Sequence, residues 1–242
     1  MVEQSLRMKT AIHTLLCLVL LIVPCLAQKK KTGAMAPITD NPALPRVLLI
    51  GDSISIAYTL PTRARLKEIA NVHRIPTNGG PTSKGLANID KWLGEKKWDL
   101  IHFNWGLHDL CYRHPESKVQ GRRDKVNGTV THSVEVYTVN LEKLVQRLQQ
   151  TGAILIFATT TPVPEKEAGR KLGDDILYNK AALEVMKKHK IQVNDLHAVM
   201  ADKMTKFAAG LGDVHYKPEG SKLLADQVAA TIKEALKKAS EE

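Results

Sequence analysis

Short aliphatic runs alternate with stretches of helical periodicity from about residue 45 to the end of the chain. Five runs have the length and composition of buried strands: 47–50, 72–75, 98–104, 153–158 and 191–194. Helices are expected between and after them, at 53–70, 86–93, 133–152 and 175–189, with a closing helix marked by the apolar stripe of residues 224–236. This alternation predicts βαβ units, and therefore an α/β domain with a mainly parallel five-stranded sheet.

The first expected strand runs directly into Gly51-Asp52-Ser53. Gly51 permits a sharp turn, so Asp52 and Ser53 follow at the carboxyl end of a central strand, where open α/β sheets bind their ligands. A serine there can act as a nucleophile if a base reaches it. Asp and Ser also commonly cap the next helix, and a plain turn is the alternative interpretation of the same tripeptide.

Three further loops carry residues suited to acyl transfer. They contain Gly79, Gly80 and Ser83, then Gly106, His108 and Asp109, and finally Asp213 and His215. His215 can take the proton of Ser53, and Asp213 can hold the imidazole in the required tautomer. Backbone N–H groups of the 79–83 loop and a side chain near Gly106 can bind an oxyanion, where one donor contributes about 3 kcal/mol.

Taken together, these loops resemble the sequence blocks of the SGNH (GDSL-type) hydrolases. The resemblance spans roughly residues 46–236 and keeps the order of the family, with blocks at Gly51–Ser55, Asn78–Gly85, Gly106–Asp109 and Asp213–His215. It implies a single-domain esterase with a three-layer α/β/α sandwich of flavodoxin-like type, working without a metal or other cofactor.

The resemblance also implies a role for each site residue. Ser53 is the expected nucleophile, with His215 and Asp213 as its catalytic partners. The expected oxyanion hole consists of Ser53, Gly80 and His108, with Asp52 and Asp109 in support.

Three features depart from the pattern of the family. In the second block, the register from Asn78 puts Ser83 where the family usually has a glycine, so the N–H of Gly79, Gly80 or Ser83 can be the oxyanion donor, with Gly80 favoured. His108 occupies the usual position of an asparagine, but a neutral imidazole still donates one hydrogen bond. Asp213 precedes His215 by two positions rather than three, with Gly212 in the usual place of the acid. The site is therefore a triad closed by a tighter turn, or a Ser–His dyad.

The segment at 110–132 has no clear period and is strongly basic. It holds five Lys and Arg residues against Glu116 and Asp124. Segments of this length tend to be functional or disordered, so it is expected as a basic flap beside the site or as a solvated insertion.

The first 44 residues are expected to lie outside the fold. Residues 1–27 have a basic start, an apolar stretch and small residues before a cleavage point after Ala27, which predicts a signal peptide and export. Residues 28–44 are rich in Lys, Pro and small residues and are expected as a disordered linker, with the esterase domain at 45–242. Cleavage would leave Cys111 as the one cysteine and so exclude an intramolecular disulfide.

The net charge bears on the partners of the protein. The formal charge of +10 becomes +9 when residues 1–27, with two basic residues and one acidic residue, are removed. Such a balance favours anionic partners such as acidic glycans or a membrane surface, while export and the lack of an aromatic-basic motif disfavour nucleic acid. Trp105, beside the Gly106 turn, is a candidate for lining a sugar-binding cleft.

Three functions remain open at this stage. The first is an exported esterase that removes small acyl groups, chiefly acetyl, from a carbohydrate or another small ester. The second is a phospholipid or lysophospholipid acyl hydrolase, with the basic segment facing anionic lipid. The third is a binding module on an esterase scaffold that has lost its activity. The sequence does not indicate an oligomeric state.

Overall fold

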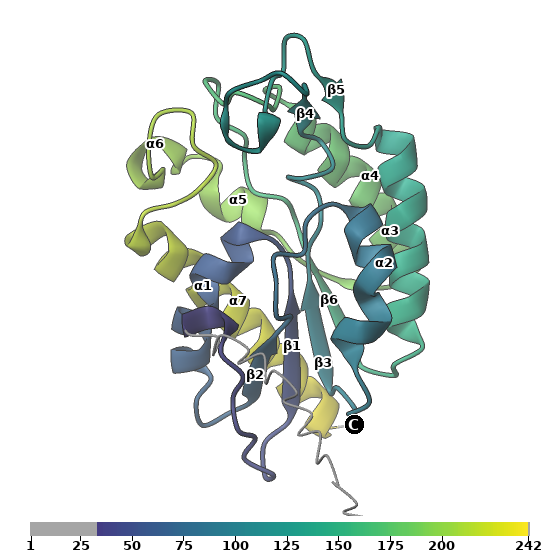
Figure 1. Ribbon diagram of the computed structural model, residues 1–242. Coiled ribbons are helices and arrows are strands. Elements are labelled where there is room, and N and C mark those ends of the chain that lie inside the picture. Colours follow the sequence, from purple (N-terminus) through teal and green to yellow (C-terminus); the bar gives the residue numbers. More distant parts are fainter. Residues whose placement is uncertain (1–32, 242) are drawn as a thin grey trace, which may run out of the picture. The chain divides into compact units, whose positions relative to one another are not determined.

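The computed structural model describes residues 33–241, which belong to one compact unit spanning residues 31–242 (Figure 1). The signal peptide predicted at 1–27 lies outside the described residues. At the centre is a five-stranded sheet with the order β2-β1-β3-β6-β7, and every neighbouring pair is parallel. The strands are β1 (Arg46–Ile50), β2 (Asn71–Arg74), β3 (Leu100–Phe103), β6 (Ile154–Ala158) and β7 (Gln192–Asn194).

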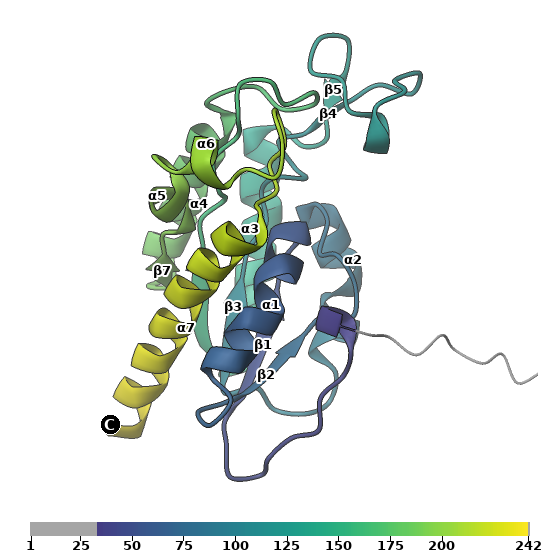
Figure 2. The same ribbon diagram turned by 90° about the vertical axis from the view of Figure 1, so that its left-hand side faces the viewer.

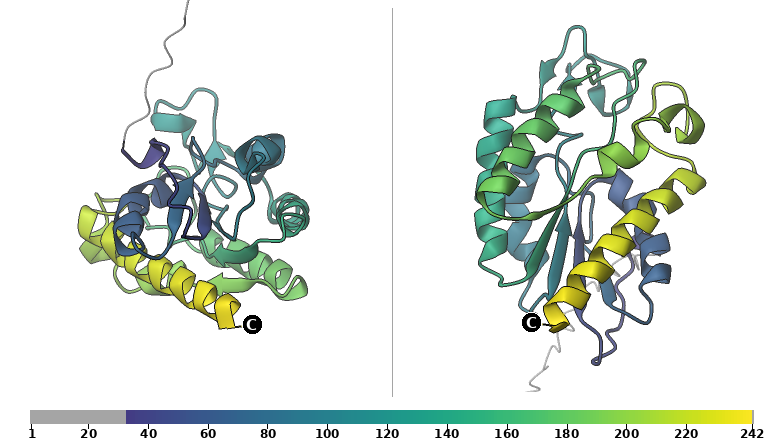
Figure 3. Two further views of the ribbon diagram at one scale, coloured as in Figure 1. Left: turned by 90° about the horizontal axis from the view of Figure 1, so that it is seen from below. Right: turned by 180° about the vertical axis from the view of Figure 1, so that it is seen from behind.

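Helices cover both faces of this sheet (Figures 2 and 3). On one face α1 (Ser53–Arg65) packs against α7 (Pro218–Glu241), and on the other α3 (Val134–Gln149) packs against both α2 (Thr82–Leu93) and α4 (Asp174–Lys188). The strands β1 and β3 are almost completely buried because helices lie over both of their faces, which explains their unbroken apolar sequences. The predicted three-layer, flavodoxin-like sandwich is confirmed.

Several helices and strands differ in extent from the predictions. α1 ends at Arg65 rather than near residue 70, since the chain turns at Leu66 to enter β2. α2 begins at Thr82, and β3 is confined to residues 100–103. Four short helices were not predicted: η1 (Gly33–Met35), η2 (Gln120–Arg122), α5 (Leu196–Met200) and α6 (Met204–Phe207). None of the helices in residues 33–241 combines the length and the hydropathy needed to cross a bilayer.

The described part of the predicted linker, residues 33–44, packs on the domain instead of being disordered. The Asp40 carboxylate contacts His73 Nε2 at 2.5 Å and Arg46 Nε at 2.9 Å. Asn41 exchanges backbone-to-side-chain hydrogen bonds with Asn71 of β2. The prediction of a linker was wrong here because its polar residues find their partners on β1 and β2, which the local composition does not reveal.

The basic segment forms a small lobe at the carboxyl end of the sheet (Figures 1 and 2). We call residues 112–131 the basic lobe. Its framework is an antiparallel pair of two-residue strands, β4 (Tyr112–Arg113) and β5 (Thr129–Val130), with a 3-10 turn, η2 (Gln120–Arg122), between them.

The strand order reverses direction between β1 and β3. The connection after β1 runs to β2 on one side, and the chain then returns to place β3 on the other side of β1. Sheets of this type bind ligands in the crevice that such a reversal leaves at the carboxyl ends of the strands. Ser53 follows β1 and His108 follows β3, so both lie at this position.

Candidate active site

Ser53, His215 and Asp213 form a continuous hydrogen-bonded chain. His215 Nε2 lies 2.8 Å from Ser53 Oγ, although the two residues are 162 positions apart in the sequence. On the other side of the ring, His215 Nδ1 lies 2.6 Å from Asp213 Oδ1. This is the geometry of a nucleophile, a base and an orienting acid.

A tight turn allows Asp213 to reach His215 from only two positions away. Gly212 adopts a φ of +70°, and a Cβ at this position would lie 2.3 Å from the carbonyl oxygen of Lys166, so glycine is required there. Asp213 Oδ1 then also accepts the backbone N–H of His215 at 2.9 Å. Burial opposes ionisation of Asp213, but these hydrogen bonds and the nearby charge of Arg123 outweigh it and lower its pKa. Of the two alternatives left open by the sequence, the geometry is that of a triad.

The turn of residues 51–53, which we call the nucleophile turn, places Ser53 at the first residue of α1. Asp52 is buried and caps this helix, accepting the backbone N–H of Ile54 at 2.9 Å. The N–H of Ser53 has no carbonyl partner within the helix, as is general for the first turn, and it points from the positive end of the helix dipole. This N–H group is therefore a suitable donor to an oxyanion.

Arg74, at the end of β2, holds the nucleophile turn by hydrogen bonds. Its Nη2 atom donates to the carbonyl oxygens of Gly51 at 2.9 Å and Asp52 at 3.0 Å, and to Ser55 Oγ at 2.8 Å. Burial lowers the pKa of Arg74 to about 10, so the guanidinium stays charged at neutral pH. Sequence reasoning missed this residue, although an arginine at the end of an expected buried strand was a signal.

The 78–80 loop lies against the nucleophile turn. Gly79 donates its N–H to the carbonyl oxygen of Gly51 at 2.9 Å, and a Cβ on Gly79 would lie 2.9 Å from that oxygen. The N–H of Gly80, predicted as an oxyanion donor, donates to Asn78 Oδ1 within its own loop at 2.9 Å. To serve an oxyanion, Gly80 would have to exchange this partner for the substrate.

His108 lies in the loop that follows β3. Neither of its ring nitrogens makes a hydrogen bond to any of the residues 33–241, so both are available to a ligand. Burial, assisted by the charges of Arg170 and Arg113, lowers the pKa of His108 against the opposing charges of Asp52 and Asp109. The ring is therefore neutral at physiological pH and carries one N–H that can be donated.

Asp109 is completely buried and joins two of the site loops. Its carboxylate accepts the backbone N–H of Thr82 at 2.9 Å, the hydroxyl of Thr82 at 2.5 Å and His132 Nδ1 at 2.6 Å. A carboxylate at the N-terminus of α2 is also favoured by the helix dipole. Asp109 thus fixes the position of the His108 loop relative to α2.

A buried charged cluster, also missed from the sequence, contacts the loop that carries His108. Glu167 is completely buried and binds Arg123 Nη1 at 2.6 Å and Arg170 Nη1 at 2.9 Å. Arg170 Nε donates to the carbonyl oxygen of Leu107 at 2.7 Å, so the cluster connects the basic lobe to the His108 loop. Two guanidinium groups share one carboxylate, which leaves a net positive charge here.

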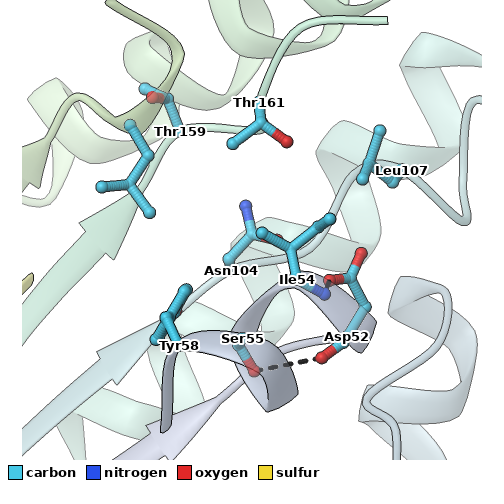
Figure 4. A pocket seen from close by; sticks show the side chains of 9 residues that line it. Asp52, Ile54, Ser55, Tyr58, Asn104, Leu107, Thr159 and Thr161 are labelled. Atoms are coloured by element: carbon cyan, nitrogen blue, oxygen red, sulfur yellow. Dashed lines mark hydrogen bonds between the residues drawn. The ribbon is translucent and has the colours of Figure 1, made fainter. Parts of the chain in front are cut away.

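Two hollows lie near the triad. A recess of about 10 Å³, room for about one water molecule, opens beside the first turn of α1, where Asn104 Nδ2 donates to the carbonyl oxygen of Ala158 (Figure 4). A larger cavity of about 730 Å³ adjoins the turn before Asp213. Its lining includes Val163, Met204 and Gly212, together with three exposed apolar side chains, Leu172, Ile176 and Leu211.

Other candidates from the sequence have structural positions. Trp105, the candidate for lining a sugar-binding cleft, is 1% exposed and packs against Phe103, so it fills the core instead. Cys111 is buried and unpaired, and burial raises the pKa of its thiol. Among residues 33–241 no group of three His, Cys, Asp or Glu side chains is arranged to hold a metal ion.

The fold and the sequence define a family. Residues 49–223 match the model of the GDSL-like Lipase/Acylhydrolase family, so the chain belongs to that family, and the resemblance to SGNH hydrolases is confirmed. Among curated proteins, a GDSL esterase/lipase of Arabidopsis thaliana is 26% identical over 125 residues, which is 42% of this chain. The match spans half of the length of that relative.

Solved structures share the fold at low sequence identity. The acetyl xylan esterase AlAXEase superposes with a TM-score of 0.62 and 16% identity, covering 77% of this chain and 99% of that one. A lipase/acylhydrolase from Enterococcus faecalis superposes with a TM-score of 0.63 and 19% identity, covering 79% of this chain and 96% of that one. Axe2, an acetylxylan esterase from Geobacillus stearothermophilus, superposes with a TM-score of 0.61 and 14% identity, covering 77% of this chain and 93% of that one.

Proposed function

We propose that this protein is a serine esterase that removes small acyl groups, chiefly acetyl, from carbohydrate. The observation that carries the proposal is the hydrogen-bonded chain from Ser53 Oγ through His215 to Asp213. Membership of the GDSL-like family supports ester hydrolysis, and two of the similar structures are named as acetyl xylan esterases.

In the proposed first half-reaction, Ser53 Oγ attacks the carbonyl carbon of the ester while His215 Nε2 takes its proton. The charge that develops on the carbonyl oxygen is stabilised by the N–H of Ser53 and by His108, with Gly80 as a third donor if it releases Asn78. His215 then gives the proton to the leaving alcohol oxygen, and the acyl group remains on Ser53.

In the second half-reaction, His215 takes a proton from water, which attacks the acyl carbonyl. The tetrahedral intermediate collapses, Ser53 recovers its proton from His215, and the carboxylic acid leaves. Asp213 stabilises the charged imidazole in both halves. No step requires a metal or another cofactor.

The test is the loss of activity in Ser53→Ala. We expect this variant to lose hydrolysis of 4-nitrophenyl acetate and labelling by a fluorophosphonate, with an unchanged melting temperature. The adduct on the wild-type protein should map to the peptide containing Ser53. Ser240→Ala, near the end of α7, is the matched control and should behave as wild type. Undiminished turnover in Ser53→Ala would refute the esterase mechanism, and a folded wild-type protein that forms no adduct would favour a binding module.

The cavity of about 730 Å³ favours a second candidate function, the hydrolysis of phospholipid or lysophospholipid. The cavity has the size of a ligand site, is rimmed by three exposed apolar side chains and adjoins the turn that carries Asp213. A series of 4-nitrophenyl esters separates the two functions. A steep fall of kcat/KM beyond the butyrate ester supports the carbohydrate esterase, whereas a rise toward octanoate or longer supports the lipid hydrolase.

Export remains part of the proposal. Its support is the pattern of charged, apolar and small residues at positions 1–27. When the full chain is expressed in a bacterium with a secretion pathway, the mature protein should begin at Gln28. A protein that keeps residues 1–27 would contradict export.

A further inference from the structure

The basic lobe carries charge that the rest of the protein leaves largely uncompensated. Of its five Lys and Arg residues, only Arg123 meets a carboxylate of residues 33–241, that of Glu167. Arg113 and Arg122 donate to the carbonyl oxygens of Gly121 and Pro115, and Lys125 Nζ donates to that of Glu165 at 2.9 Å. Carbonyl groups satisfy the N–H donors without cancelling the charge. Lys118 is exposed and makes no ion pair with any residue in the described range 33–241.

The acidic residues of the lobe do not neutralise this charge. The Asp124 carboxylate accepts the backbone N–H groups of Val126 and Asn127, both at 2.9 Å, and so closes a turn. Glu116 is exposed and forms no salt bridge within the described part of the chain. Five cations against two anions leave the lobe with a formal charge of +3.

The lobe is fixed to the active-site loops. Tyr112 donates its N–H to Gly169 at 2.6 Å, and His132, directly after the lobe, donates its N–H to the carbonyl oxygen of Asp109. The charge of Arg123 helps to lower the pKa of Asp213, and the charge of Arg113 helps to lower the pKa of His108. These contacts hold the positive charge beside the triad, which a solvated insertion would not require.

We propose that the basic lobe binds the negatively charged groups of a polysaccharide, so that the ester bond to be cleaved is carried by an anionic glycan. This inference rests on the proposed esterase function and names its substrate class. Charges of this kind raise the encounter rate with an oppositely charged partner by about 10- to 10³-fold at low salt. Added salt screens them, and at about 0.1 M the Debye length is about 10 Å.

The apolar content of the lobe favours a glycan over a membrane. Proteins that bind a bilayer surface through a basic region usually insert Trp, Phe or Leu side chains as well. Among the described residues, the large apolar side chains that the lobe exposes are two valines, Val119 and Val126. Carboxylate or sulfate groups on a polar polymer need only the charges, which are present.

The first test uses the unmodified enzyme and the ratio of kcat/KM for two polymers, O-acetylated polygalacturonate and O-acetylated xylan. We expect a preference of about tenfold or more for the anionic polymer at about 0.02 M NaCl, and its disappearance at about 0.5 M. The double variant Lys118→Gln/Arg122→Gln should lower the ratio by about fivefold or more at low salt. Lys233→Gln/Lys237→Gln, on exposed positions of α7, is matched in charge and should leave the ratio unchanged.

A binding measurement separates this inference from the proposed function. Ser53→Ala should bind polygalacturonate without ester groups, and the lobe substitutions should weaken that binding, even if the enzyme proved to hydrolyse no ester. A wild-type preference that is absent at low salt, or a ratio that the lobe variant does not change, would overturn the inference. Binding to phosphatidylglycerol vesicles without binding to polygalacturonate would also overturn it, in favour of a lipid surface.

Discussion

Arg74 Nη2 lies 2.8 Å from Ser55 Oγ, two positions beyond the proposed nucleophile. The same nitrogen also contacts the carbonyl oxygens of Gly51 and Asp52, so one buried guanidinium holds the whole nucleophile turn. Because α1 starts at Ser53, the direction of this helix and the position of Ser53 Oγ both depend on that turn.

Replacement of Arg74 should therefore reduce kcat without a comparable change in KM. Arg74→Met removes the three contacts and leaves buried acceptors short of a donor, so we expect a free energy of unfolding lower by about 2 kcal/mol and a kcat lower by about 10²-fold. Arg74→Lys should recover part of kcat. The measurements are steady-state kinetics with 4-nitrophenyl acetate and urea unfolding. Equal loss of stability in both variants with unchanged kcat would assign Arg74 a purely structural role.

Asp213→Asn tests whether the acid is required. An amide in place of the carboxylate favours the wrong tautomer of His215 and removes a negative charge beside the ring, so kcat should fall by about 10²- to 10⁴-fold. Asp90→Asn, at an exposed position of α2, is the control. A decrease of less than about fivefold would mean that Ser53 and His215 work as a dyad, despite the 2.6 Å contact.

Two substitutions test whether His108 acts as an oxyanion donor. His108→Leu removes the free ring N–H and should lower kcat by about 10²- to 10³-fold, the value of one oxyanion donor. His108→Asn replaces it with an amide donor and should retain most of the activity. If both variants lose activity equally, the ring acts through its shape and not through a hydrogen bond.

His102 should make the protein less stable in acid. The ring is buried in β3, with Nε2 3.1 Å from Asn194, and burial lowers its pKa from the ordinary 6.5 to about 4. Between these values the unfolded chain binds more protons, so the contribution of His102 to stability is complete above about pH 6.5 and is lost as the pH falls toward 4. Its size is about 3 kcal/mol.

The measurement is urea unfolding of wild type and His102→Gln between pH 4 and pH 8. The difference between their free energies of unfolding should change by a few kcal/mol across this range. His197, whose pKa is raised by its hydrogen bond to Asp175 against the effect of burial, changes stability in the opposite sense, but it is present in both proteins and cancels. A constant difference would show that His102 does not titrate in this way.

The sequence alone predicted the order of strands and helices, because each depends on a local pattern of apolar residues. It also predicted that the loops carrying Ser53 and His108 lie together, because both follow parallel strands at the carboxyl edge of the sheet. The loop of His215 precedes α7 instead of following a strand of the sheet, so only the tertiary structure decided that it reaches Ser53. Ser53 and Asp213 belong to one site although they are far apart along the chain, because the folded domain brings their loops together.

Contacts between polar residues far apart in the sequence were decided only by the tertiary structure. Arg74 supports the nucleophile turn, Glu167 joins the basic lobe to the His108 loop, and Asp40 holds the segment predicted as a linker. Each is a charged side chain whose free energy depends on the partner it meets when it leaves water. No local pattern contains that partner, whereas an apolar strand needs only burial, which the pattern itself predicts.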